Sequence, residues 1–172
     1  MHFLRGILKA ISRGTGWIED NFIVIVTAFL ILGVFGMVIT RYVLEVPTPY
    51  LEELTRWVLI GLTFIGFAAV TRKDAHIKAD LLQLFKVKEL TRRKLQVSAD
   101  ILVFLANCIL AYACYQFAAY AWSLPGVSNT MPTVRLAWVE STLFVGAILS
   151  VFHMAAIVFR ETRDLIKDIR EQ

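Results

Sequence analysis

Long apolar runs, separated by short polar segments, dominate the pattern of the chain. Four runs contain no Asp, Glu, Lys or Arg: Phe22–Thr40, Trp57–Thr71, Ile101–Trp122 and Ser141–Phe159. A bilayer core about 30 Å thick needs roughly 20 helical residues at about 1.5 Å each. Three of the runs span that thickness alone, and the second does so with the residues before it. Membrane β-strands alternate apolar and polar positions, which these runs do not.

The pattern therefore predicts an all-α membrane protein with four transmembrane helices in one domain, 1–172. The first run is too long for the apolar core of a signal peptide and is expected to be retained. Prolines at Pro47, Pro49, Pro125 and Pro132 mark the short connections after the first and third spans, because proline cannot continue a helix. The spans are expected at about residues 22–43, 51–71, 99–123 and 137–159.

Two further segments predict short amphipathic helices at the membrane interface. In residues 1–16, apolar side chains recur at helical spacing while Arg5, Lys9 and Arg13 follow at four-residue intervals, a pattern typical of an interfacial helix. Gly14 and Gly16 are expected to break it before the first span; a frayed basic terminus is the alternative. The loop 72–98 carries an apolar cluster among its charges and is expected to lie on the cytoplasmic surface.

The positive charges indicate the orientation. Of the 18 Lys and Arg residues, fifteen lie in the N-terminal segment, the middle loop and the C-terminal tail. Only Arg41, Arg56 and Arg135 lie in the other two connections. Because positive residues concentrate on the cytoplasmic side, both termini are predicted to be cytoplasmic. The formal net charge of +4 therefore reflects the orientation in the membrane and does not indicate nucleic-acid binding. The composition, 58% hydrophobic, disfavours a soluble enzyme.

Polar groups within the spans are few, and none is an acid at mid-span. Asn107, Gln116 and His153 are expected to hydrogen-bond across helices, so no proton or cation relay is predicted. Cys108 and Cys114 are expected to be small buried apolar residues, and no metal or cofactor site is predicted. The rival hypothesis is a self-contained four-helix membrane redox or quinone-linked protein that uses His153 or the cysteines.

Charges at the predicted outer ends of the spans are the candidate contact residues. Glu52 and Arg56 have the spacing of an i,i+4 ion pair, Glu53 is a second acid in the same turn, and Trp57 suits the headgroup level. They serve either as interfacial caps and anchors or as contacts with another membrane protein. Glu140, near the outer start of the fourth span, is expected to have its partner on another element.

Two motifs resemble a known family. The stretch Tyr50–Trp57, with its paired acids, and the stretch Thr71–Leu82, with His-Ile-x-x-Asp at His76 and Asp80, resemble the small (Q-type, DctQ-like) membrane subunit of tripartite ATP-independent periplasmic (TRAP) transporters. The number of spans, the topology and the loop lengths extend this resemblance over the whole chain. The fourth span departs from the pattern, with Phe144 where proline is common.

The resemblance implies a function. A small TRAP subunit is a non-catalytic permease subunit of the bacterial inner membrane. It pairs with a large, elevator-type membrane subunit, which holds the substrate and sodium sites. A periplasmic binding protein delivers an organic acid, such as sialic acid or a dicarboxylate. The partners implied here are these two proteins and membrane lipids, with no nucleic acid and no cofactor.

The resemblance also implies roles for particular residues. Glu52, Glu53, Arg56 and Trp57 would form part of the outer contact surface. His76 and Asp80 would either hold the cytoplasmic turn after the second span or act as a local loop cap.

Overall fold

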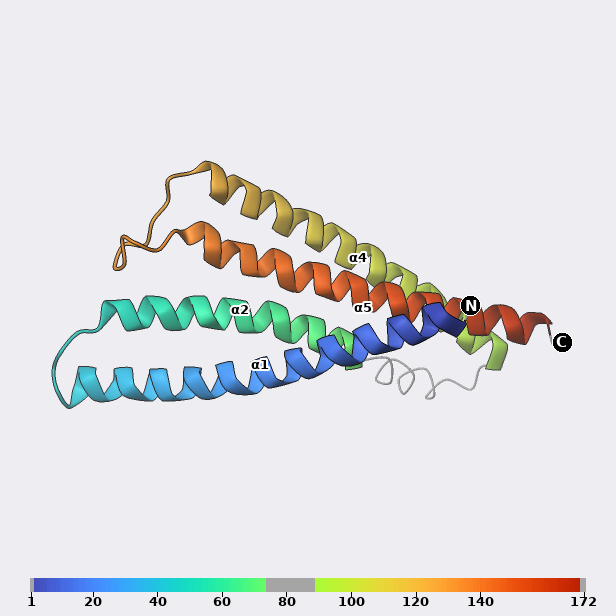
Figure 1. The fold of residues 1–172 in the computed structure, drawn as a ribbon, viewed down its shortest axis with the longest axis horizontal. Coiled ribbons are helices and arrows are strands. Elements are labelled where there is room, and N and C mark those ends of the chain that lie inside the picture. Colours follow the sequence, from blue (N-terminus) through green and yellow to red (C-terminus); the bar gives the residue numbers. More distant parts are fainter. Residues whose placement is uncertain (1, 74–88, 171–172) are drawn as a thin grey trace.

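The computed structural model describes residues 2–73 and 89–170, and four helices contain most of them. Each of the four is long and apolar enough to cross a membrane, as the sequence predicts. His76, Asp80 and the predicted loop helix near Leu81–Phe85 lie outside the described residues. The helices are α1 (His2–Tyr42), α2 (Pro49–Lys73), α4 (Glu89–Ser123) and α5 (Leu136–Arg170), as Figure 1 shows.

The helices form a row in the order α1, α2, α5, α4. The main packing contacts join α1 to α2, α2 to α5, and α5 to α4, so α1 and α4 form opposite edges (Figure 1). Both ends of the chain lie at one end of the row, which we call the terminal end. The α1–α2 turn and the α4–α5 loop lie at the other, which we call the loop end.

Helices α4 and α5 continue beyond the predicted spans at the terminal end. Helix α4 begins at Glu89, before the expected start at 99, and α5 continues to Arg170, past the expected end at 159. Neither extension contains proline or glycine, so nothing stops the helical hydrogen-bond pattern where the apolar run ends. An ion pair between Arg93 and Asp168 joins the two extensions. Charged helix ends thus project past the apolar part of the row.

Helix α1 passes through Gly14 and Gly16 without interruption, so the predicted break there is wrong. A glycine inside a helix costs only about 1 kcal/mol relative to alanine, which does not terminate a helix with helical flanks. Gly16 has a packing reason instead, because a Cβ atom there would clash with Nη1 of Arg72. The glycine therefore allows the guanidinium to approach the backbone of α1.

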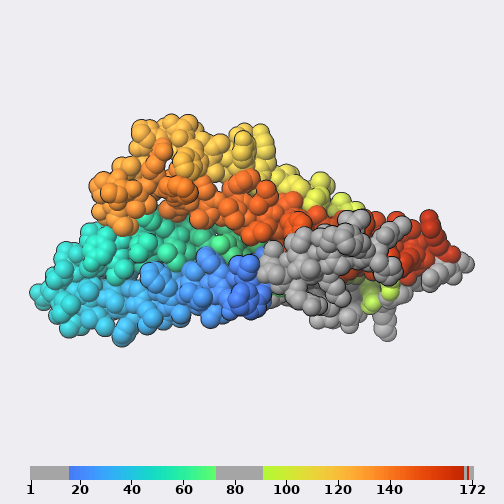
Figure 2. Space-filling view, in the orientation of Figure 1, coloured from blue at the N-terminus to red at the C-terminus, as the bar shows by residue number. Residues whose placement is uncertain are grey.

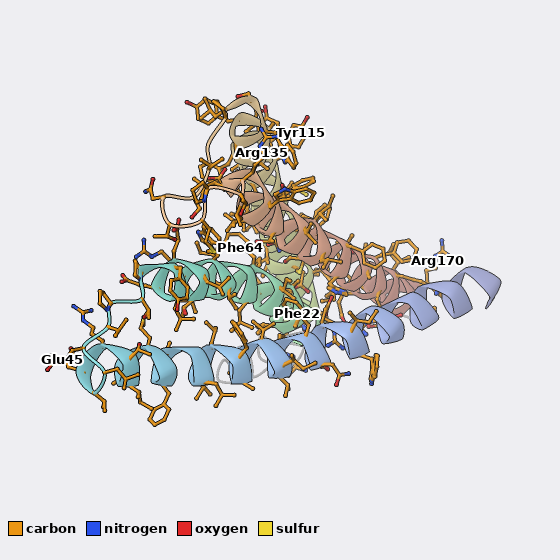
Figure 3. All side chains as sticks on the ribbon, turned by 60° about the vertical axis from the view of Figure 1, so that its left-hand side comes forward. Phe22, Glu45, Phe64, Tyr115, Arg135 and Arg170 are labelled. Carbon is orange, nitrogen blue, oxygen red and sulfur yellow. The ribbon has the colours of Figure 1, made fainter. Side chains whose placement is uncertain are left out.

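The α1–α2 turn ends one helix and starts the next where the prolines predict. Glu45 follows α1 with a φ of 53°, at the loop end of the row (Figure 3). The carbonyl of Thr48 accepts hydrogen bonds from the amides of Leu51 (3.1 Å) and Glu52 (3.3 Å). Pro49 occupies the first helical position, where its missing N–H has no cost.

Helices α2 and α5 approach each other closely. The buried residues there are small: Ala68 and Ala69 from α2, and Ala147 and Ser150 from α5. A Cβ atom at Gly146 would lie 2.6 Å from the backbone carbonyl carbon of Phe64, which Figure 3 labels. Such backbone proximity is typical of transmembrane helix contacts built on small residues.

This crossing predicts a position-specific effect of added methyl groups. Gly146→Ala should lower the free energy of unfolding by about 1–3 kcal/mol, because the methyl group meets backbone atoms that cannot move aside. Gly66→Ala is the matched control, since a Cβ atom there meets nothing within 4 Å. Unfolding of both variants in mixed micelles, followed by circular dichroism, measures the difference. Equal stability of the two would contradict the close crossing.

Candidate functional site

A buried ionic cluster joins three helices at the terminal end of the spans. The Glu19 carboxylate, from α1, lies 2.7 Å through Oε1 from Nε2 of His153 on α5. Its Oε2 accepts a hydrogen bond of 3.1 Å from Nε of Arg72 on α2. Nη2 of Arg72 also donates to Oδ1 of Asp20 (3.0 Å) and to the carbonyl of Gly16 (3.2 Å). Each oxygen of Glu19 therefore has a partner on a different helix.

Burial raises the energetic cost of breaking these contacts. Glu19 is 4% exposed and His153 is 3% exposed, and an unpartnered charge at such a site would be costly. Helix α1 has little other burial, since only 6% of its apolar window is buried in the chain. The cluster, together with packing on α2, therefore holds α1 in the row.

Uncharged polar groups extend the cluster across the row. Oγ1 of Thr71 on α2 lies 3.0 Å from Oγ of Ser150 on α5. The same Ser150 hydroxyl donates to Oδ1 of Asn107 on α4 at 3.4 Å. Nδ2 of Asn107 is buried and has no hydrogen-bond partner among the described residues. The predicted interhelical hydrogen bonds of Asn107 and His153 are confirmed, and polar contacts connect all four helices.

Sequence analysis missed Glu19 and Arg72 because each lies just outside an apolar run, where a charge is expected to belong to a connecting segment. A usable signal was present. In a four-span topology, the start of the first span and the end of the second meet at the same membrane face. Opposite charges at those two positions, Glu19-Asp20 and Arg72-Lys73, can pair, and His153 is the one titratable residue in the fourth apolar run.

At the loop end, Glu53 holds the loop between α4 and α5. Its Oε2 accepts hydrogen bonds from Oγ of Ser128 (2.8 Å), from the amide of Thr130 (3.2 Å) and from the Thr130 hydroxyl. The Ser128 hydroxyl in turn accepts from the amides of Thr130 (3.2 Å) and Met131 (2.9 Å). One carboxylate of α2 thus organises a loop more than 70 residues away in sequence.

The same loop is also attached at its base. An isolated β-bridge pairs Val127 with Arg135. The guanidinium of Arg135, labelled in Figure 3, lies 5.3 Å from the ring centroid of Trp122 at the end of α4. Trp122 packs edge-on against Trp138 at the start of α5, with centroids 5.3 Å apart. These contacts give the loop a defined shape at the loop end.

The other predicted contact residues remain at the surface or partly buried. Glu52 and Arg56 form the expected ion pair at 3.3 Å, with both side chains more than half exposed; such pairs contribute about 0–1 kcal/mol. Trp57 and Glu140 are half-buried. Glu140 has no hydrogen bond or ion pair to any residue in the described part of the chain, so its expected partner on another element is not found there.

Within the described residues, Gln116 does not form the expected hydrogen bond to another helix. Its Nε2 donates to the hydroxyl of Tyr112 on the same helix at 2.9 Å, and both side chains are exposed. Gln116 lies on the face of α4 that points away from α5, so it reaches no neighbouring helix. Cys114 is buried, as predicted, whereas Cys108 is half-buried; both are free thiols.

The clusters are suited to holding helices together. Within residues 2–73 and 89–170, no three His, Cys, Asp or Glu side chains are arranged to hold a metal ion. The ionisable groups of the terminal-end cluster contact one another, with Nε2 of His153 directed at Glu19. The interactions of this cluster are ion pairs and hydrogen bonds that join helices.

The buried cluster predicts a large effect from removal of one partner. Arg72→Leu should lower the free energy of unfolding by about 3–5 kcal/mol, because it leaves the Glu19 carboxylate undercompensated in a buried site. Arg56→Leu is the matched control. It removes an arginine whose pair with Glu52 is exposed and should change stability by less than about 1 kcal/mol. Denaturant titration in mixed micelles measures both, and similar losses would refute the distinction.

The Glu53 contacts predict a local effect. Glu53→Ala should accelerate hydrogen exchange at the Thr130 and Met131 amides by at least about tenfold, because both depend on Glu53 or on the Ser128 hydroxyl that it positions. Glu52→Ala, one residue away and without a contact to this loop, should leave their exchange unchanged. Mass spectrometry of exchanged peptides provides the measurement. Unchanged protection in Glu53→Ala would show that the loop does not depend on this carboxylate.

Comparison with known families agrees with the motifs of the second helix. The family model described as "Tripartite ATP-independent periplasmic transporters, DctQ component" matches residues 30–164, which include the spans from the middle of α1 to α5. A search of curated proteins gave no match to the chain. Because the matched region covers well over half of the 172 residues, the chain belongs to the DctQ family, the small membrane component of tripartite ATP-independent periplasmic transporters.

Proposed function

We propose that this chain is the non-catalytic scaffold of a sodium-coupled importer for organic acids, such as sialic acid or dicarboxylates. In this proposal it supports a large elevator-type subunit in the bacterial inner membrane and helps to dock a periplasmic binding protein. The observation that carries the proposal is the family match over residues 30–164. Substrate selectivity and the sodium sites belong to the other components.

The use of charge within the chain supports a scaffold role. Two of the buried ionisable groups, Glu19 and His153, contact each other, and Arg72 completes the cluster. Ion-coupled transport needs polar groups that bind and release ions, whereas these groups hold α1 against its neighbours. An open row also leaves broad apolar faces, since at most 28% of any candidate span is buried within the chain. Such faces offer area for a second membrane protein.

The two ends of the row suit opposite sides of the membrane. Basic residues gather at the terminal end, so the positive-inside rule favours a cytoplasmic location for both termini. The loop end then faces the periplasm. That end carries the loop held by Glu53. It also carries a depression of about 230 Å³, which is lined by residues at and beside the α1–α2 turn, including Arg41 and Glu52. The loop and the depression, which has both polar and apolar lining residues, support a docking role toward a soluble protein.

No specific observation favours the redox alternative. A haem or quinone site would need His153 or the thiols free to bind the group. Nε2 of His153 is directed at Glu19 instead, and Cys114 is buried in α4.

Reconstitution tests the proposal. Liposomes that contain this chain and the large subunit, with binding protein and substrate outside and an inward sodium gradient, should accumulate radiolabelled organic acid. Omission of this chain should reduce uptake to background, because the large subunit would lack its fixed support. Liposomes with the sodium gradient collapsed are the control. Uptake at full rate without this chain would contradict the scaffold role.

A further inference from the structure

The two edges of the row differ in chemistry. Figure 2 shows α1 and α4 at opposite edges. Every exposed side chain of α1 between Phe22 and Ile39 is apolar, which suits contact with lipid tails. The exposed face of α4 instead carries the hydroxyls of Tyr112 and Tyr120 and the amide of Gln116. A glutamine within a transmembrane helix can hydrogen-bond to a side chain of a neighbouring helix.

Two of these polar groups, Tyr112 and Gln116, lie well inside the candidate membrane span of α4, Thr91–Ser123. Tyr112 and Gln116 precede the last residue of the helix, Ser123, by 11 and 7 residues. At about 1.5 Å per residue, they lie about 16 Å and 10 Å from that end, within the depth of a hydrocarbon core about 30 Å thick. Headgroups and water at the interface therefore do not satisfy them.

The hydrogen bonds of the pair are incomplete within the chain. One Nε2 hydrogen of Gln116 is donated to the Tyr112 hydroxyl at 2.9 Å. The second amide hydrogen and the carbonyl oxygen of Gln116 have no partner among the described residues, nor has the hydrogen of the Tyr112 hydroxyl. Lipid tails supply none, and each polar group left unsatisfied in an apolar medium is unfavourable. A partner with donors and acceptors would remove that cost.

The surrounding residues have the spacing of a helix-packing seam, which we call the α4 seam. Its members follow one another by alternating steps of three and four residues, a repeat typical of interlocking helices. Two alanines allow close approach of a neighbouring helix. All members are exposed in the chain alone: Ala106, Ile109, Ala113, Gln116 and Tyr120.

We propose that the α4 seam packs against a transmembrane helix of the large subunit, which supplies a hydrogen-bonding side chain to Gln116 and Tyr112. This inference rests on the proposed function, because the partner is the large membrane component of the same transporter. The α1 edge, which carries only apolar exposed groups between Phe22 and Ile39, faces lipid. The row thus joins the transporter by one edge.

Site-specific photo-crosslinking in membranes that contain the whole transporter tests the seam. Ile109 on α4 and Leu32 on α1 are each 71% exposed, so a benzophenone amino acid at either position makes a matched pair. Crosslinks from position 109 should contain the large subunit, and those from position 32 should contain lipid. Crosslinks from 109 to lipid only, or to a second copy of this chain, would overturn the proposal.

The variant Gln116→Leu separates the seam from folding. Because it removes polar groups from a lipid-exposed face, it should not lower the thermal midpoint of the isolated chain. In the transporter it should reduce the large subunit recovered with the tagged chain by about three- to tenfold, the loss of one interhelical hydrogen bond. Unchanged or increased recovery would overturn the proposal.

A comparison with the unmodified chain distinguishes failure of the seam from failure of the proposed function. If the unmodified chain recovers the large subunit but Gln116→Leu has no effect, the seam is refuted and the scaffold role stands. If the unmodified chain recovers no large subunit, the proposed function fails, and the seam with it. Ala28→Trp on the exposed face of α1 is a control that should leave recovery unchanged, whereas Ala113→Trp should reduce it.

Discussion

The shared carboxylate of Glu19 is the contact on which the position of α1 depends. One oxygen contacts His153 and the other contacts Arg72, so a single buried group connects three helices. Small residues hold α2 against α5, but α1 buries little surface of its own. In a membrane, apolar helices gain little from association with one another because lipid is equally apolar. Polar contacts therefore contribute much of what makes the row specific.

The same reasoning explains why the row is open. Helices α1 and α4 each pack mainly against one neighbour, and their other faces are left for lipid or protein. The buried Glu19 and His153 contact each other inside the chain, and Glu53 and its partners shape the loop end. A chain built in this way can present fixed surfaces to larger partners. These features agree with the proposed role of the chain as a supporting subunit of the transporter.

Sequence reasoning predicted the number of spans and their loop-end limits, because uncharged runs and prolines act locally. It failed where the outcome depends on which faces meet. Gly16 reads as a helix breaker but accommodates Arg72, and Gln116 reads as an interhelical contact but lies on an outer face. Glu53 contacts Ser128, 75 residues away, and no local pattern predicts that contact. The partner-contact roles of Glu52, Glu53, Arg56, Trp57 and Glu140 stay predictions, as does the turn or cap role of His76 and Asp80.

We propose that this chain is an immobile support held together by its buried cluster. Electron cryomicroscopy of the chain with its large subunit, in the inward- and outward-facing states, tests that claim most directly. The four helices should superpose between the two states, with the Glu19 contacts to Arg72 and His153 intact in both. Separation of Glu19 from either partner, or movement of α1 relative to α2 and α5 between the states, would contradict it.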